Sequence, residues 1–333
     1  MRQKCESNRA FLLFILGFSL AFRSHAAQGV VLKETTYSGM CDASAGVILT
    51  DDLFLVADDE LNILRVYSLS RGGAPLSSLH LNVFLEVQKG SPEADIEGAA
   101  RVGDLVYFIS SHGRNKAGRE RGSRERFFAT KITSTNDPHI QVFGVPYKKL
   151  LDDLEAAPAL KKYRINEASL LTPKEKGALN IEGLAAGPDG SLLIGFRNPL
   201  HKKKALIVPL LNPADLVAGK GPAQFGKPIE LDLDGNGIRD FVLAGSDYYL
   251  IGGSYKGGGA SEIYHWDGKS READLLYRWE PHIVNAEAIM AIPGKPGELL
   301  ILSDDGSKRK LGIECKELPE FARHFRSILL QTR

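Results

Sequence analysis

The chain has 333 residues, enough for one large hydrophobic core, and 43% of them are hydrophobic while 25% are charged, as in a globular protein. Its 42 basic and 41 acidic side chains give a formal net charge of +1 at pH 7. This balance excludes the strong positive charge with which proteins bind nucleic acid, so we predict no nucleic-acid partner.

Residues 1–26 have the three parts of a secretory signal peptide. Basic residues occupy the start, an apolar run follows over residues 11–22, and Ser24 and Ala26 are small residues of the kind that a signal peptidase reads. We expect cleavage after Ala26, and the apolar run is too short to anchor the chain in a bilayer. The mature protein is therefore expected at residues 27–333, in the periplasm or secreted, with no membrane span.

A short pattern recurs along the rest of the chain. Its clearest copies, residues 95–99 and 180–184, both contain Ile-Glu-Gly. Weaker copies begin at Asp42 and Asn285, and a more divergent copy spans residues 237–241. Repeats of one small structural unit are typical of propellers and other arrays.

Each copy is followed by the same order of elements: an apolar stretch, a turn, a strand, a polar loop and another strand. The strands are indicated by Ile, Leu, Val, Phe and Tyr between Gly, Asp and Pro. In chain order they lie at 53–58, 63–69, 105–112, 126–132, 191–198, 205–211, 248–254, 262–266, 298–304 and 324–331, with fourth strands expected at 79–87, 140–145, 228–233 and 275–279.

Four antiparallel strands repeated around an axis make a β-propeller, in which closure of the circle protects the sheet edges. The last copy leaves no room for a fourth strand, whereas residues 30–37 form a strand without a partner. The sequence therefore predicts an all-β fold, a single propeller of about five four-stranded blades that the N-terminal strand completes. A β-sandwich without symmetry is the alternative, and the choice between five and six blades stays open.

Residues 147–177 interrupt the repeat between its second and third units. Leu150, Leu151, Leu154 and Ala157 lie at helical spacing there. We predict a short helical insertion on the second blade, and an irregular loop is the alternative.

The repeat also predicts which side chains meet. The first and second strands of a blade are antiparallel, so the start of one and the end of the other lie on the same face. Glu97, Glu182 and Glu287 occupy matching positions and would surround one mouth of the central channel. Carboxylates at close range need a cation beside them to stay charged, so we predict a site for Ca²⁺ or another divalent cation. In the alternative, these carboxylates cap strand ends and pair with arginine.

Further polar residues fall on the same face. His112 and Asp304 are candidates for a catalytic acid and base. The candidates for binding a substrate are Asp58, Arg114, Arg197, Asn198, Arg239 and Asp305. The loop 113–124 is rich in arginine, which suits a phosphate or carboxylate ligand, and a solvated loop is the alternative.

A second place for calcium is the segment 232–240, whose Asp and Asn residues resemble the start of an EF-hand loop. The acidic residue that such a loop needs at its end is Leu243 here. The repeat explains the same segment as a strand, a turn and the next inner strand.

Two cysteines, Cys41 and Cys315, remain once Cys5 leaves with the signal peptide. Cys41 precedes the first copy of the repeat, and Cys315 follows the second strand of the last blade. In a closed propeller these positions share one face of two neighbouring blades, and an exported protein favours a disulfide between them. Two separate thiols are the alternative.

Several of these strings resemble a bacterial family catalogued as domain of unknown function 3616. They include Gly-Phe-Arg-Asn-Pro at 195–199 and the segments 95–98, 110–114, 180–184, 237–239 and 302–306, and the resemblance covers nearly the whole mature chain. It implies a propeller-like fold and no established activity. The Glu-Gly repeats are also loosely similar to esterase-like phytase propellers and calcium-dependent lactonase propellers, which suggests a hydrolase by analogy.

Three functions fit these features. The first is metal-dependent hydrolysis of a phosphoester or lactone, in which Glu97, Glu182 and Glu287 hold a cation that activates water. The second is a non-catalytic propeller of the cell envelope that binds a small anionic ligand or another exported protein. The third is a structural protein in which the carboxylates serve blade packing alone.

Overall fold

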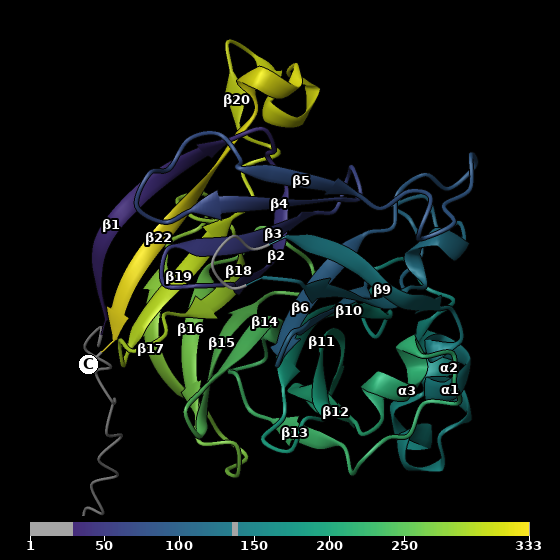
Figure 1. Cartoon of the computed structure of the whole chain (residues 1–333). Coiled ribbons are helices and arrows are strands. Elements are labelled where there is room, and N and C mark those ends of the chain that lie inside the picture. The colour runs from purple at the N-terminus through teal and green to yellow at the C-terminus, as the bar shows by residue number, and fades with distance from the viewer. Residues whose placement is uncertain (1–28, 135–138, 333) are drawn as a thin grey trace, which may run out of the picture.

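The computed structural model describes residues 29–134 and 139–332. Its strands form five four-stranded antiparallel sheets around a central axis, which confirms the predicted single β-propeller (Figure 1). The predicted signal peptide, residues 1–26, lies outside the described residues. Among the helices that are described, none is both long and apolar enough to cross a membrane.

Each of the first four blades uses four consecutive strands, from the innermost to the outermost. The first blade holds β2 (Ala43–Ile48), β3 (Leu53–Asp58), β4 (Ile63–Ser68) and β5 (Ser77–His80). The second holds β6 (Ile96–Val102), β7 (Leu105–Ser110), β8 (Phe127–Ile132) and β9 (Ile140–Tyr147). The third holds β10 (Asn180–Ala186), β11 (Leu192–His201), β12 (Lys204–Leu210) and β13 (Ile229–Leu231), and the fourth holds β14 (Gly237–Ala244), β15 (Asp247–Gly253), β16 (Ser261–Trp266) and β17 (Asp274–Trp279).

The fifth blade joins the two ends of the chain. Its strands are β18 (Ala286–Ala291), β19 (Glu298–Ser303), β22 (His324–Thr332) and β1 (Gly29–Ser38), in that order from the axis. Figure 1 shows the purple β1 alongside the yellow β22, and the two pair antiparallel along their whole length. The N-terminal strand therefore completes the last blade, as the sequence predicts.

The pattern of burial explains the composition of the strands. The inner strand β2 and the next strands β3 and β4 are buried almost throughout, because neighbouring blades cover both faces of each sheet. Strands covered on both faces are nearly continuous apolar runs. The outermost strands β5 and β9 are largely exposed; β5 carries polar residues, whereas β9 exposes apolar side chains such as Val142 and Val145.

A cluster of buried aromatic side chains lies at the boundary between the fifth and first blades. Tyr37 of β1 stacks on Phe325 of β22 with ring centroids 5.2 Å apart. Tyr67 of β4 meets both rings edge-on, and Phe54 of β3 meets Tyr37 edge-on. Aromatic pairs at such distances stabilise a fold by about 0.5–1.5 kcal/mol each beyond their buried area. The closing strand is therefore fixed by side chains as well as by its backbone hydrogen bonds.

Every inner strand has a β-bulge at the same position of the repeat. The residue that interrupts the register against the second strand is always the third of the motif: Ser44, Glu97, Glu182, Arg239 or Glu287. A bulge leaves one residue unpaired and redirects its side chain. The fold thus turns equivalent side chains of five blades towards the axis.

The helical insertion lies between the second and third blades, as predicted. It contains α1 (Leu150–Ala156), the 3-10 helix η2 (Pro158–Tyr163) and α2 (Ile165–Ala168), and its apolar side chains pack against the strands of both blades. The sequence analysis missed helix α3 (Pro213–Val217) and the hairpin β20 (Arg309–Lys310) to β21 (Ile313–Glu314). Three short 3-10 helices complete the elements: η1 (Gly122–Arg124), η3 (Cys315–Glu317) and η4 (Glu320–Ala322).

One expected strand is shorter than predicted, and the calcium-like segment has the structure that the repeat predicts. The expected strand 79–87 ends at His80, because Leu85 donates its N–H to the carbonyl of Leu81 over 2.8 Å and forms a turn that buries both leucines. In the calcium-like segment, residues 232–236 form the turn after β13 and residues 237–240 begin β14, which is the structure that the repeat predicts.

The predicted disulfide is present between Cys41 and Cys315, whose Cα atoms lie 6.0 Å apart. Cys41 lies at the entrance to β2 in the first blade, and Cys315 lies beyond the β20–β21 hairpin in the fifth. The two cysteines are separated by 274 residues. The bond therefore joins the first and last blades on the face that carries the motif residues.

We expect the Cys41→Ala, Cys315→Ala double variant to unfold at a lower urea concentration than the parent protein. A cross-link over a long loop reduces the entropy of the unfolded chain, and loss of one costs about 2–5 kcal/mol. Urea denaturation of both proteins, with and without a reducing agent, measures the difference. The reducing agent should lower the midpoint of the parent and leave that of the variant unchanged; equal midpoints in all four experiments would contradict the expectation.

Candidate functional site

The motif residues of several blades surround a cavity at one mouth of the channel. Two adjoining hollows of about 250 and 630 Å³ share Asp59, Glu60, Lys116, Lys174 and Arg197 in their walls. We call their union the mouth cavity. It is also lined by Asp42, Glu93, Asp95, Glu97, Arg114, Asn180, Glu182, Arg239, Asn285, Glu287 and Asp304.

Two of the three glutamates expected as metal ligands are paired with arginine. Glu182 accepts a hydrogen bond from Nη1 of Arg197 at 2.5 Å, and its other oxygen lies 3.5 Å from Nε of Arg239. Arg239 also pairs with Glu287 and donates to the amide oxygen of Asn285 over 2.7 Å. Buried guanidinium groups therefore already balance the charges of Glu182 and Glu287.

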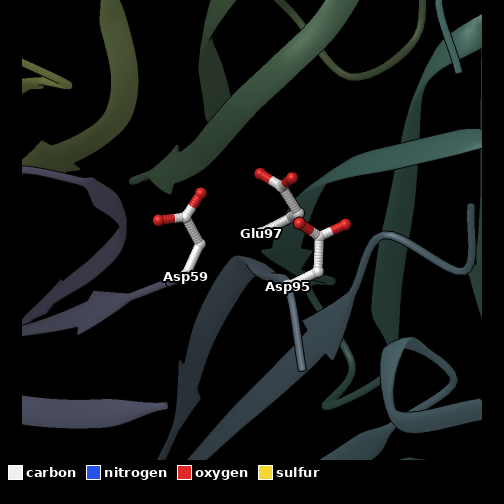
Figure 2. Close-up of side chains that lie close together, drawn as sticks. All are labelled: Asp59, Asp95 and Glu97. Carbon is white, nitrogen blue, oxygen red and sulfur yellow. The ribbon is translucent and has the colours of Figure 1, made fainter. Parts of the chain in front are cut away.

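The third glutamate belongs to a separate acidic group. Glu97 lies beside Asp59 and Asp95, and one carboxylate oxygen of each lies within 4.8 Å of those of the other two. Figure 2 shows the three carboxylates gathered from two blades, since Asp59 follows β3 and the other two lie at the start of β6. We call Asp59, Asp95 and Glu97 the acidic trio.

Polar contacts with neighbouring side chains hold Asp95 in place. Nη1 of Arg124 lies 2.9 Å from Asp95, and Nη2 of the same guanidinium donates to Glu93 over 2.6 Å. The hydroxyl of Ser111 also donates to Asp95. The arginine-rich loop thus supplies one structural cation to the trio and is not merely solvated.

Several carboxyl groups of the mouth cavity have pKa values above their ordinary range. Burial, followed by repulsion from Asp304 and Asp58, raises the pKa of Asp42 to about 8. Burial raises the pKa of Asp95 to about 7, against the opposing effect of Arg124. Burial and neighbouring carboxylates also raise the pKa of Asp59 and Glu97 well above their ordinary values. The cavity therefore carries more carboxylates than its arginines balance.

Two carboxylate oxygens at this place have no hydrogen-bond partner among the described residues. They are Oδ1 of Asp59 and Oε2 of Glu182, and Glu182 is only 3% exposed. A buried acceptor without a donor is costly unless a ligand satisfies it. A cation that prefers oxygen ligands, such as Ca²⁺, fits this donor set.

Of the two candidates for acid and base, only Asp304 lines the mouth cavity. Burial raises the pKa of Asp304, and its carboxylate accepts hydrogen bonds from Asn285 at 2.9 Å and from the N–H of Gly306 at 2.7 Å. His112 is buried behind the walls, where Nδ1 lies 2.7 Å from the carbonyl of Ser110 and burial lowers the pKa of the imidazole to about 4. Its catalytic role stays a prediction.

Three of the residues expected to bind substrate make structural contacts instead of lining the mouth cavity. Asp58 accepts from the N–H of Leu61 at 2.9 Å, and Asp305 accepts from Nε of Arg326 at 2.8 Å. Asn198 donates to two backbone carbonyls of the insertion. In contrast, Arg114, Arg197 and Arg239 do line the mouth cavity.

The sequence analysis assigned no role to several acidic residues of the cavity. Asp42 and Asp95 open their copies of the repeat, and Asn180 and Asn285 hold the same position in theirs. The first and third positions of a strand point to the same side, so this position carries the missing signal. Asp59 directly follows β3 at the position that Asp304 holds after β19, so its equivalence to a predicted catalytic residue is the signal that could have singled it out.

The fold and the mouth cavity define a five-bladed β-propeller with a charged cavity at one end of its channel. The chain belongs to the family described as "Protein of unknown function (DUF3616)", whose model matches residues 42–137 and 145–298. This confirms the resemblance seen in the sequence. Comparison with curated proteins gives no match.

Among solved structures, the chain is similar to the glutaminyl cyclase of Myxococcus xanthus, with 10% identity, a TM-score of 0.48 and coverage of 92% of this chain and 97% of that one. It is also similar to the PQQ-bound aldose sugar dehydrogenase of Streptomyces coelicolor, with 14% identity, a TM-score of 0.45 and coverage of 93% and 100%.

We expect Arg239→Leu to lower the free energy of unfolding by about 3–5 kcal/mol, because Glu182 and Glu287 lose a buried cation. Arg271→Leu is the matched control, since Arg271 is exposed in the same blade and should change stability by less than about 0.5 kcal/mol. Urea denaturation at neutral pH measures both. A loss in Arg239→Leu no larger than in the control would contradict this account of the network.

The raised pKa values predict that the metal-free protein loses stability as the pH rises. An ordinary aspartate has a pKa of 3.8, whereas folded Asp42 and Asp95 have pKa values of about 8 and about 7. The folded state therefore binds more protons than the unfolded state between these values, and stability falls with pH there. Thermal melting in EDTA over that pH range measures the slope. It should be flatter in Asp42→Asn; an equal slope would contradict the role of Asp42.

Proposed function

We propose that the protein is an exported metal-dependent hydrolase that acts on a phosphoester or lactone in the mouth cavity. The single observation that carries the proposal is the acidic trio, three carboxylates within 4.8 Å of one another on the wall of a charged cavity. Asp59, Asp95 and Glu97 would hold Ca²⁺ or another divalent cation, with water or substrate oxygens as further ligands.

The residues of the cavity suit this chemistry. A bound cation supplies activation of water and polarisation of a substrate oxygen. Asp304, with its raised pKa, is placed on the same wall to hold a proton that a leaving group needs. Arg197 and Arg239 add positive charge to the cavity. Because both already pair with glutamate, they would favour an anionic substrate mainly through their electrostatic field.

Export is supported by the Cys41–Cys315 disulfide, since such bonds persist in oxidising compartments. We propose the periplasm or the extracellular space as the location. Cell fractionation with a tagged full-length chain tests it, and recovery of the protein with free thiols in the cytoplasm would contradict it.

A non-catalytic propeller that binds a small anionic ligand or another exported protein is the second candidate. The position of His112 favours it, because the only histidine expected to act as acid or base is not among the described residues that line the mouth cavity. Turnover separates the two candidates. A panel of phosphoesters and lactones, assayed with and without EDTA, should show hydrolysis that EDTA abolishes if the first candidate is correct.

We expect the parent protein, stripped with EDTA, to bind Ca²⁺ and the Asp59→Asn, Glu97→Gln double variant not to bind it. Calorimetric titration measures binding directly, and Ca²⁺ at about 100 times its Kd should stabilise the parent by about 2.7 kcal/mol. Affinity should rise with pH, because the carboxyl groups with raised pKa values must lose their protons first.

Asp51→Asn is the matched control for this titration, because Asp51 is exposed in the turn between β2 and β3, at the other end of the blade. It should bind Ca²⁺ as the parent does. Undiminished binding or hydrolysis by the double variant would refute the acidic trio as the metal site, and the absence of binding by the parent to Ca²⁺, Mg²⁺, Mn²⁺ and Zn²⁺ would refute the metal.

A further inference from the structure

Two lysines also line the mouth cavity, and their charge is opposite to that of the acidic trio. Lys116 lies in the loop between β7 and η1, and Lys174 lies in the segment between α2 and β10. Both line each of the two hollows that form the mouth cavity. We call Lys116 and Lys174 the lysine pair.

The lysine pair has no carboxylate partner, although carboxylates line the same cavity. Within residues 29–134 and 139–332, neither lysine forms an ion pair. Other lysines of this face do: Lys316 lies 3.1 Å from Glu60, and Lys308 lies 3.3 Å from Asp305. The fold therefore keeps two cationic groups apart from the carboxylates that could neutralise them.

The positive groups of the mouth cavity crowd one another. Burial, then the charges of Arg197 and Lys116, lower the pKa of Lys174. Nζ of Lys174 and Nη2 of Arg197 would lie 3.3 and 3.8 Å from a Cβ atom on Gly257, so both converge on this glycine. Gly257 to Gly259 line the cavity with no side chain, which leaves room beside the cations.

The segments that carry the lysine pair are tied to each other and to the third blade. Nε of Arg114 donates to the carbonyl of Ser169 over 2.9 Å, which joins the two segments. The amide of Asn198 donates to the carbonyls of Pro173 and Glu175, one on each side of Lys174. The lysines thus project from backbone that is held in place, and the loss of conformational entropy on binding a ligand is correspondingly smaller.

We infer that the lysine pair binds the phosphoryl group of a phosphoester. A phosphoryl group carries up to two negative charges, which two ammonium groups without other partners can balance, and its remaining oxygens can face the acidic side of the cavity. A neutral lactone would offer the two exposed lysines no negative charge. The inference rests on the proposed function, and within it selects phosphoesters over lactones.

The experiment measures the affinity for inorganic phosphate and for phenyl phosphate by calorimetric titration, with the full mature chain either free of metal or loaded with Ca²⁺. The variant is Lys116→Gln, Lys174→Gln. The control is Arg119→Gln, Lys176→Gln, which removes the same charge from the same two segments at positions that are exposed, as Lys116 and Lys174 are, but do not line the cavity.

We expect the lysine variant to bind phenyl phosphate at least about tenfold more weakly than the parent, the loss expected for charge-assisted hydrogen bonds, and the control to bind it as the parent does. Equal weakening in the lysine variant and the control would show that only the total charge of the protein matters, and it would overturn the inference. Failure of the parent to bind either phosphate compound, with and without Ca²⁺, would overturn it as well.

The titration with Ca²⁺ described above keeps the two proposals distinguishable. If Ca²⁺ binds and phosphate does not, the metal site stands and the lysine pair is wrong. If phosphate binding depends on the lysine pair in a protein that binds no divalent cation, the lysine pair stands and the metal-dependent hydrolase is wrong.

Discussion

The antiparallel pairing of β1 with β22 is the constraint on which the rest of the structure depends. It supplies the fourth strand of the last blade from the start of the chain, so the inner strands of all five blades contact one another in a closed circle. Only in that arrangement do residues as distant in sequence as Asp42 and Asp304 line one cavity. The aromatic cluster around Tyr37 and Phe325 and the Cys41–Cys315 bond both lie at this junction, where an opening of the circle would begin.

Within that circle, the bulges bring carboxylates together, and only some of these carboxylates are paired with arginine. They direct several carboxylates to one mouth, where burial disfavours their charge. Arg239 and Arg197 neutralise Glu182 and Glu287, whereas the ion pair of the acidic trio among the described residues is that of Arg124 with Asp95, and the trio retains raised pKa values. The same cavity is lined by the lysine pair, which forms no ion pair among the described residues. The cavity therefore holds charged groups of both signs.

The repeat is sufficient to predict the blades, because its strands are apolar on both faces and its turns recur in the same order; β3 begins and ends at the predicted residues. The candidate site is less predictable. Glu97, Glu182 and Glu287 are equivalent in sequence and do meet at one mouth, but which of them pairs with arginine depends on the side chains of the adjacent blade that reach each bulge. His112 is expected to end a strand but lies two residues beyond β7, where its backbone has φ at 55° and its ring is buried, which no local pattern reveals.

The disulfide has a topological consequence for the chain. Since Cys41 and Cys315 lie 274 positions apart and most of the propeller lies between them, the bond converts most of the molecule into a covalent loop. A protease that cuts one exposed turn within that loop leaves every blade attached to the same molecule. A nicked copy would thus keep its blades linked through the disulfide.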